Sequence, residues 1–102
     1  MMTAVRVLLW HRAPAEGLAP LLTAYHEVSA RLAGLPGLVR NELLVSPHDP
    51  DSVVIASEWA DLTAYRAWED DPAHRDISAP LRPFRDPERS PAWQVLEVVA
   101  EH

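Results

Sequence analysis

The order in which two kinds of apolar pattern alternate along the chain is the strongest constraint on its fold. Apolar side chains recur at helical spacing from Leu18 to Leu32. A second helix is expected from Asp61, whose carboxylate can cap it, to about Asp70, followed by a short helical piece over 73–81. Breaker-free β-rich segments occupy 4–10, 38–46, 52–59 and 92–100. The order β-α-β-β-α-β predicts an α+β, ferredoxin-like fold, with a four-stranded antiparallel sheet and both helices on one face.

The β-rich segments carry apolar residues on both sides, which bears on how the chain assembles. The first segment places Val5, Val7 and Leu9 on one side, and Leu8 and Trp10 on the other. A half-solvated antiparallel sheet would alternate apolar and polar residues instead. Because two helices can cover only one face, the other face is predicted to pack against the same face of a second chain. The expected partner is therefore a second copy, in a symmetric homodimer that resembles a barrel.

Composition narrows the class of protein. A chain of 102 residues is expected to form one domain over 1–102. The absence of cysteine excludes disulfides and thiolate metal sites. The net charge is −6 and the nine basic residues are scattered, so no nucleic-acid surface is expected. No apolar run reaches the ~20 residues of a membrane helix, and the first segment is interpreted as a strand rather than a signal peptide. These features predict a cytoplasmic protein without a membrane partner.

The sequence contains no recognisable cofactor motif. It has three glycines and neither a phosphate-binding loop nor a dinucleotide fingerprint. No two histidines stand at metal-ligand spacing on one predicted element. His26 lies off the apolar stripe of its helix, and His11 follows the first strand without an evident partner. The expectation is a protein with no metal and no cofactor.

Several short motifs, in their order and spacing, resemble the antibiotic biosynthesis monooxygenase family. Pro36-Gly37-Leu38 opens the second strand, Glu58-Trp59 closes the third, Ala64-Tyr65 and Trp68 lie on the helix, and Asp71-Pro72-Ala73-His74-Arg75 follow it. The resemblance covers nearly the whole chain and implies a dimeric α+β barrel. Some members of this family oxidise aromatic polyketides to quinones with O2, without metal or flavin. Others degrade haem, and many have no established activity.

Of four functional residues in the quinone-forming members, two are matched in this sequence and two are not. Their tryptophan at the end of the third strand matches Trp59, and their tyrosine on the following helix matches Tyr65. Their asparagine falls at Ile55, so a polar group is missing there, and their arginine falls near Ser78.

Arg75 and Arg82 are two candidates to replace the missing arginine, and the sequence does not choose between them. The haem-degrading members have a tryptophan that matches Trp68, but their histidine falls at Ser78 and their first-strand asparagine has no counterpart. Haem degradation is therefore not expected.

These positions define a candidate site. His74 is the best general base by residue type, because imidazole titrates near neutral pH. Tyr65 and Trp59 are candidate catalytic donors to a developing oxyanion. The expected substrate-binding residues are Trp59, Tyr65, Trp68, Ile55 and Arg75. For Trp59 and Tyr65, packing between helix and sheet is the competing interpretation, and for His74 it is capping or packing of the short helix. Trp68 is expected to be mostly structural.

The function expected from the resemblance is oxidation of an aromatic polyketide, or another polyphenolic small molecule, to a quinone. The partners are then the aromatic substrate and O2, and the substrate itself supplies the electrons. Two alternatives use the same pocket: cyclisation of a polyketide, and binding of a small molecule without catalysis. The sequence leaves open whether the chain is an enzyme.

Overall fold

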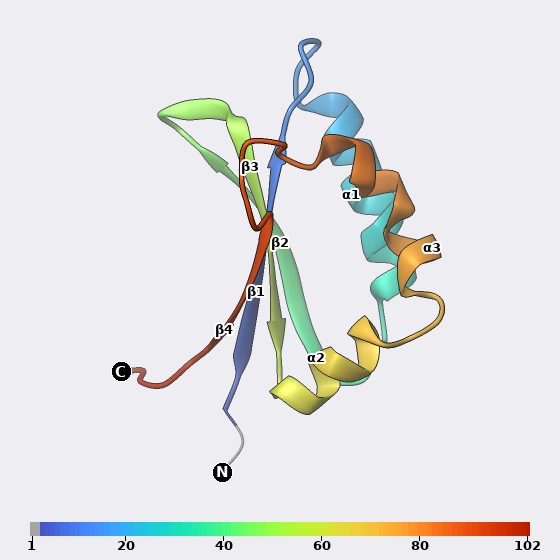
Figure 1. Cartoon of the computed structure of the whole chain (residues 1–102), viewed down its shortest axis with the longest axis vertical. Coiled ribbons are helices and arrows are strands. Elements are labelled where there is room, and N and C mark those ends of the chain that lie inside the picture. The colour runs from blue at the N-terminus through green and yellow to red at the C-terminus, as the bar shows by residue number, and fades with distance from the viewer. Residues whose placement is uncertain (1–2) are drawn as a thin grey trace.

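The computed structural model describes residues 3–102, and its element order agrees with the predicted one (Figure 1). The elements are β1 (Val5–Arg12), α1 (Ala19–Leu32), β2 (Leu38–Ser46), β3 (Asp49–Trp59), α2 (Leu62–Glu69), α3 (His74–Ser78), the 3₁₀ helix η1 (Ala79–Phe84) and β4 (Trp93–Glu97). The strand order is β2-β3-β1-β4, and each neighbouring pair is antiparallel. Figure 1 shows every helix on the same side of the sheet. The α+β ferredoxin-like fold is therefore confirmed.

Local sequence signals explain where the two main helices begin and end. Pro20 stands in the first turn of α1, where its missing N–H costs little, and Gly34 follows the helix with φ +86°. At the start of α2, the Asp61 carboxylate accepts a hydrogen bond from the Ala64 N–H at 2.8 Å. Gly37 has φ +82°, and a Cβ at this position would collide with the Cβ of Ala64. A glycine is therefore required where β2 begins beneath α2.

The strand boundaries differ from the predicted ones at the ends. Pairing of β1 with β3 continues as far as Arg12, opposite Ser52, so β1 is longer than expected. β3 begins at Asp49, which shortens the turn after β2 to two residues. β4 ends at Glu97, opposite Val5 at the start of β1, although the Val98 N–H still donates to the Ala4 carbonyl at 2.9 Å.

The helical piece expected over 73–81 is divided into two elements. The α-helix α3 ends at Ser78, and η1 continues the path to Phe84 with tighter 3₁₀ geometry. Pro80 and Pro83 lie within η1, and each lacks the N–H that a longer α-helix would use. The chain thus turns along the helical layer and returns to the sheet at β4 (Figure 1).

The core fills the space between the helices and one face of the sheet. Side chains of odd-numbered residues in β1 and β3 point to this face, as the period of two requires. Two buried clusters result. One contains Leu21, Ala24, Val28, Val53, Ile55 and Leu81. The other contains Val5, Val7, Trp59, Tyr65 and Trp68.

The opposite face of the sheet carries no helix (Figure 1), and it exposes large apolar side chains. Leu44 is 47% exposed and Leu96 is 45% exposed. A shallow groove on this face is lined by residues of β1, β2 and β3, namely Leu8, Trp10, Leu44, Val45, Ser46, Ser52 and Val54. Among the residues that the structure describes, no helix has the length and apolar character needed to cross a membrane.

Candidate active site

A cavity of about 220 Å³ lies between the helical layer and the sheet. The sequence-predicted residues Ile55, Trp59, Tyr65, Trp68 and His74 all line it. They come from β3, α2 and α3, so the fold brings together residues that are up to 19 positions apart in the sequence. Most of the wall is apolar, and a small number of polar groups reach into it. This combination is typical of a small-molecule site.

The sheet side of the cavity is formed by alternate residues of β3. Ile55 is 5% exposed and Trp59 is 2% exposed, with Ser57 between them on the same face. The Trp59 Nε1–H donates a hydrogen bond to the Ser57 Oγ at 2.9 Å. The indole N–H is therefore satisfied within the protein, and what Trp59 offers to a ligand is the surface of its ring.

Tyr65 meets Trp59 edge to face, with ring centroids 5.6 Å apart and an interplanar angle of 71°. Its hydroxyl donates to the Glu69 carboxylate at 3.1 Å, one helical turn further along α2. Burial, together with the negative charge and the hydrogen bond of Glu69, raises the pKa of Tyr65 well above its usual value. The phenol therefore stays protonated at neutral pH, and its oxygen keeps lone pairs that can accept a hydrogen bond.

His74 has a defined tautomer in this arrangement. Its Nδ1 lies 3.2 Å from the Trp68 main-chain carbonyl, which can only accept, so Nδ1 carries the hydrogen. In the neutral form of the ring, Nε2 then bears the lone pair that a general base needs. The imidazole packs on the Trp68 ring, with centroids 4.5 Å apart. Trp68 thus contributes both to the core and to the orientation of His74.

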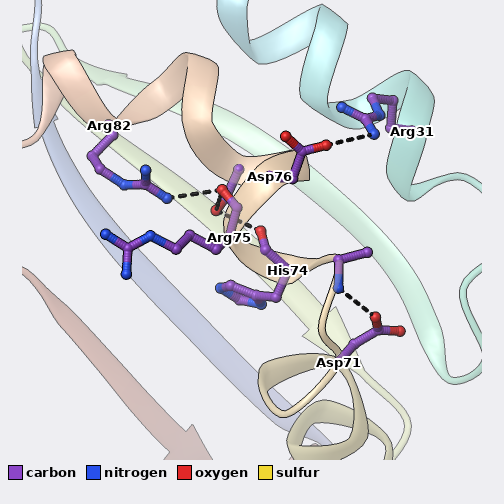
Figure 2. A network of polar contacts seen from close by, with 8 residues as sticks. Arg31, Asp71, His74, Arg75, Asp76 and Arg82 are labelled. Carbon is purple, nitrogen blue, oxygen red and sulfur yellow. Dashed lines mark hydrogen bonds and ion pairs between the residues drawn. The ribbon is translucent and has the colours of Figure 1, made fainter.

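Polar contacts on α3 hold the segment that carries His74 (Figure 2). The Ser78 hydroxyl donates to the His74 carbonyl at 2.7 Å. Asp76 points away from His74 toward α1, where Arg31 Nη2 lies 3.3 Å from its Oδ2 (Figure 2). Asp71 Oδ1 accepts from the Ala73 N–H at 2.8 Å, just before the helix begins. These contacts tie a five-residue helix to its surroundings.

The arginines are placed differently from the expectation. Arg75 is exposed and does not line the cavity, and its main-chain carbonyl accepts from Arg82 Nη2 at 2.9 Å (Figure 2). Arg82 does not line the cavity either. Arg85, in the loop after η1, is the arginine that reaches it. Its place depends on a loop path that no local sequence pattern specifies.

Four further polar residues of the cavity wall were not predicted from the sequence: Ser29, Asn41, Ser57 and Glu69. Asn41 of β2 lies opposite Ser57 of β3 in the sheet register. The signal that could locate this pair is the alternation of strand residues, which assigns a face but leaves the register between two strands open. Glu69 could be found from its position one turn after Tyr65 on the same helix.

His11 is buried, at 2% exposure, but it lies outside the cavity. Its Nδ1 lies 3.0 Å from the Leu9 carbonyl. Burial lowers the pKa of His11, and the nearby positive charge of Arg85 lowers it further. Within residues 3–102, no three histidine, aspartate or glutamate side chains gather closely enough to hold a metal ion.

Comparison with known proteins assigns the family. Residues 4–80 match the family model described as antibiotic biosynthesis monooxygenase. The chain belongs to the antibiotic biosynthesis monooxygenase family. Over 83 residues it is 32% identical to protein SchA of Streptomyces halstedii, a match that covers 81% of this chain. It is also 33% identical over 60 residues to the 42.8 kDa protein in the whiE locus of Streptomyces coelicolor. The matched segments span 22% and 15% of those two longer proteins.

Solved structures of the family share the fold. SnoaB of Streptomyces nogalater, described as a cofactor-independent oxygenase, superimposes with a TM-score of 0.74 at 20% identity. That comparison covers 100% of this chain and 96% of SnoaB. Rv0793 of Mycobacterium tuberculosis gives a TM-score of 0.74 at 15% identity, over 97% of this chain and 98% of the other. These likenesses show that the chain shares the fold of these proteins.

Proposed function

We propose that this chain oxidises a planar polyphenol, of the aromatic polyketide class or similar to it, to a quinone with O2. The observation that carries the proposal is the free Nε2 of His74 beside a cavity lined by aromatic rings. The similarity to a cofactor-independent oxygenase and to SchA supports the choice of reaction. In this reaction the substrate supplies the electrons that reduce O2.

The proposed steps balance for an anthrone, which has an acidic CH2 group between two aromatic rings. His74 Nε2 takes one proton from this carbon, and the resulting carbanion transfers an electron to O2. The two radicals combine to form a C–O bond, and a proton completes the hydroperoxide. Loss of water then leaves the quinone, so that anthrone and O2 yield anthraquinone and H2O. A general base contributes on the order of 10²–10⁴-fold to such a step.

Tyr65 and Glu69 form a hydrogen-bonded pair at the cavity, in addition to His74. The Tyr65 oxygen can accept a hydrogen bond from a substrate hydroxyl while it donates its own hydrogen to Glu69 Oε2. Glu69 is exposed, so the pair connects the cavity with solvent. Trp59 and Trp68 provide apolar ring surfaces that exclude water from the reacting carbon.

The same proposal includes a homodimer formed through the open face of the sheet. Exposed Leu44 and Leu96 support it, together with Arg6. Among residues 3–102, Arg6 Nη1 is the one buried side-chain nitrogen or oxygen without a hydrogen-bond partner. A second copy would cover the apolar area and offer acceptors near this guanidinium.

Oxygen uptake with 1,8-dihydroxyanthrone tests the proposed reaction. The expected result is consumption of one O2 per quinone formed, faster than in a protein-free control, with the quinone identified by mass. His74→Gln should lower the rate on the order of 10²–10⁴-fold. Loss of water from an uncyclised polyketone substrate, without oxygen uptake, would instead indicate a cyclase. Binding without any conversion would indicate a small-molecule carrier.

A further inference from the structure

A polar cluster closes the cavity where α1 passes over β2. Its centre is Asn41, the sole asparagine of the chain. The Ser29 hydroxyl donates to Asn41 Oδ1 at 3.1 Å, and the Tyr25 hydroxyl donates to the Asn41 main-chain carbonyl at 3.1 Å. Tyr25 and Ser29 lie one turn apart on α1. Helix and strand thus hold this residue at two points, and all three residues line the cavity.

These contacts determine which end of the amide is free. Because Oδ1 accepts from Ser29, Nδ2 is directed away from that hydroxyl, with two hydrogens to donate. Within the part of the chain that the structure describes, the Asn41 side chain makes its hydrogen bond through Oδ1 and leaves Nδ2 unused. Among residues 3–102, Nδ2 is not a buried atom without a partner, so it is accessible. Because Asn41 lines the cavity, a ligand there can accept a hydrogen bond from Nδ2.

The position of this donor relative to Trp59 restricts the kind of ligand. Asn41 lies opposite Ser57 across the sheet, and Ser57 holds the Trp59 indole. A planar ligand that contacts Trp59 in the cavity therefore lies near the Asn41 side chain.

We propose that Asn41 is the specificity-determining residue of the site, and that its Nδ2 selects planar ligands with a carbonyl or phenolate oxygen on the edge. Ser29 and Tyr25 act as positioning residues, because they touch Asn41 and fix its amide. The proposal rests on the proposed function, which requires an oxygenated aromatic ligand. It predicts that a ring of the same size without oxygen binds weakly, because the amide is then left without an acceptor.

Equilibrium dialysis with two matched rings, 5-hydroxy-1,4-naphthoquinone and naphthalene, tests this inference. Wild-type protein should bind the quinone about tenfold more tightly than the hydrocarbon, a difference of about 1.4 kcal/mol. Asn41→Leu and Asn41→Asp should abolish this preference, while their affinity for naphthalene stays within about twofold. Asn41→Asp retains the acceptor for Ser29 and replaces the donor by a carboxylate oxygen, which repels a ligand oxygen, so it decides the question if Asn41→Leu fails to fold. Ser29→Ala should lower the preference to about threefold, because the amide is then free to rotate.

Gln94→Leu provides the matched control, since it removes the other side-chain amide of the chain, from a residue outside the cavity. This variant should keep the wild-type preference. If both Asn41 variants also keep it, the inference is overturned while the proposed function stands. If wild-type protein binds neither ring, the proposed function fails, and the inference fails with it.

Discussion

The two faces of the sheet are made from the same strands, yet they differ in how their polar groups are used. On the covered face, the polar side chains gather around the cavity, where Asn41 and His74 each keep one nitrogen free. On the open face, Glu58 pairs with Arg6 at 2.9 Å and with Arg40 at 3.0 Å. The polar groups there are largely satisfied by one another, and the remaining area is apolar. A face with unused donors and acceptors suits a small ligand, whereas an apolar face with a paired charge cluster suits another protein surface.

The difference between the two faces also explains why apolar and polar residues do not alternate along the strands. Neighbouring residues such as Leu8 and Leu9 are both apolar because each faces a different partner. Leu9 lines the cavity beneath the helices, and Leu8 lines the open groove. Helices of the same chain cover one face, and the proposed second copy covers the other.

The largest effect is expected from removal of a large side chain on the covered face. Trp68 is 8% exposed and belongs to the core cluster, so Trp68→Ala should cost ~3–5 kcal/mol of unfolding free energy. Urea denaturation followed by circular dichroism would measure this loss. A loss below about 1 kcal/mol would show that Trp68 lines the cavity without supporting the core.

Adjacent residues of β4 allow the two faces to be separated directly. Leu96 lies on the open face opposite Arg6, whereas Val95 lies on the covered face opposite Val7. Leu96→Asp should weaken the proposed dimer on the order of 100-fold, about 2.7 kcal/mol, and leave a folded monomer in sedimentation. Val95→Asp should instead destabilise the fold, because it introduces a charge into the core cluster. A monomeric wild-type protein would contradict the proposed role of the open face.

A smaller change is expected from the hydroxyl that Tyr65 donates to Glu69. Tyr65→Phe removes this hydrogen bond and leaves the ring in place, so unfolding should become easier by only ~1–2 kcal/mol. Turnover of 1,8-dihydroxyanthrone should fall nevertheless, because the cavity loses its proton connection to Glu69. Unchanged turnover with reduced stability would assign Tyr65 a structural role alone.

The smallest effect is a pH dependence from His11 on the covered face. Because the pKa of His11 in the folded protein lies below its ordinary value of 6.5, the unfolded chain binds this proton more tightly. The stability that this difference provides is present above pH 6.5 and is lost as the pH falls through the lower, folded-state pKa. His11→Gln should make the free energy of unfolding less dependent on pH below 6.5. His26→Gln, at an exposed position, should leave this dependence unchanged. If the free energy of unfolding of His11→Gln depends on pH as steeply as that of the wild-type protein, His11 is not the source of this dependence.

The sequence predicted those parts of the molecule that depend on local pattern. The element order, the Asp61 cap and the glycine after α1 follow from spacing and residue type, and the structure agrees with each. Of the residues that line the cavity, Trp59 and Tyr65 were predicted from the family resemblance, which places them at the end of one strand and on the following helix.

The remaining features depend on relations between distant segments. Asn41 reaches the cavity only through the register of β2 on β3, and Arg85 only through the path of a proline-rich loop. The placement of Arg75 depends on which side of α3 it occupies, and a helix of five residues is too short to show a periodicity. Strand register and loop path are set by tertiary packing, which is why local patterns did not reveal them.

A crystal structure of the wild-type protein with 5-hydroxy-1,4-naphthoquinone tests most directly whether the covered face binds the ligand and the open face binds a second copy. The account predicts the ring in the cavity against Trp59, with one of its oxygens within hydrogen-bonding distance of Asn41 Nδ2. It also predicts the Trp10 side of the sheet covered by a second copy. A quinone bound in the open groove lined by Leu8 and Val54, with the cavity beneath the helices empty, would contradict it.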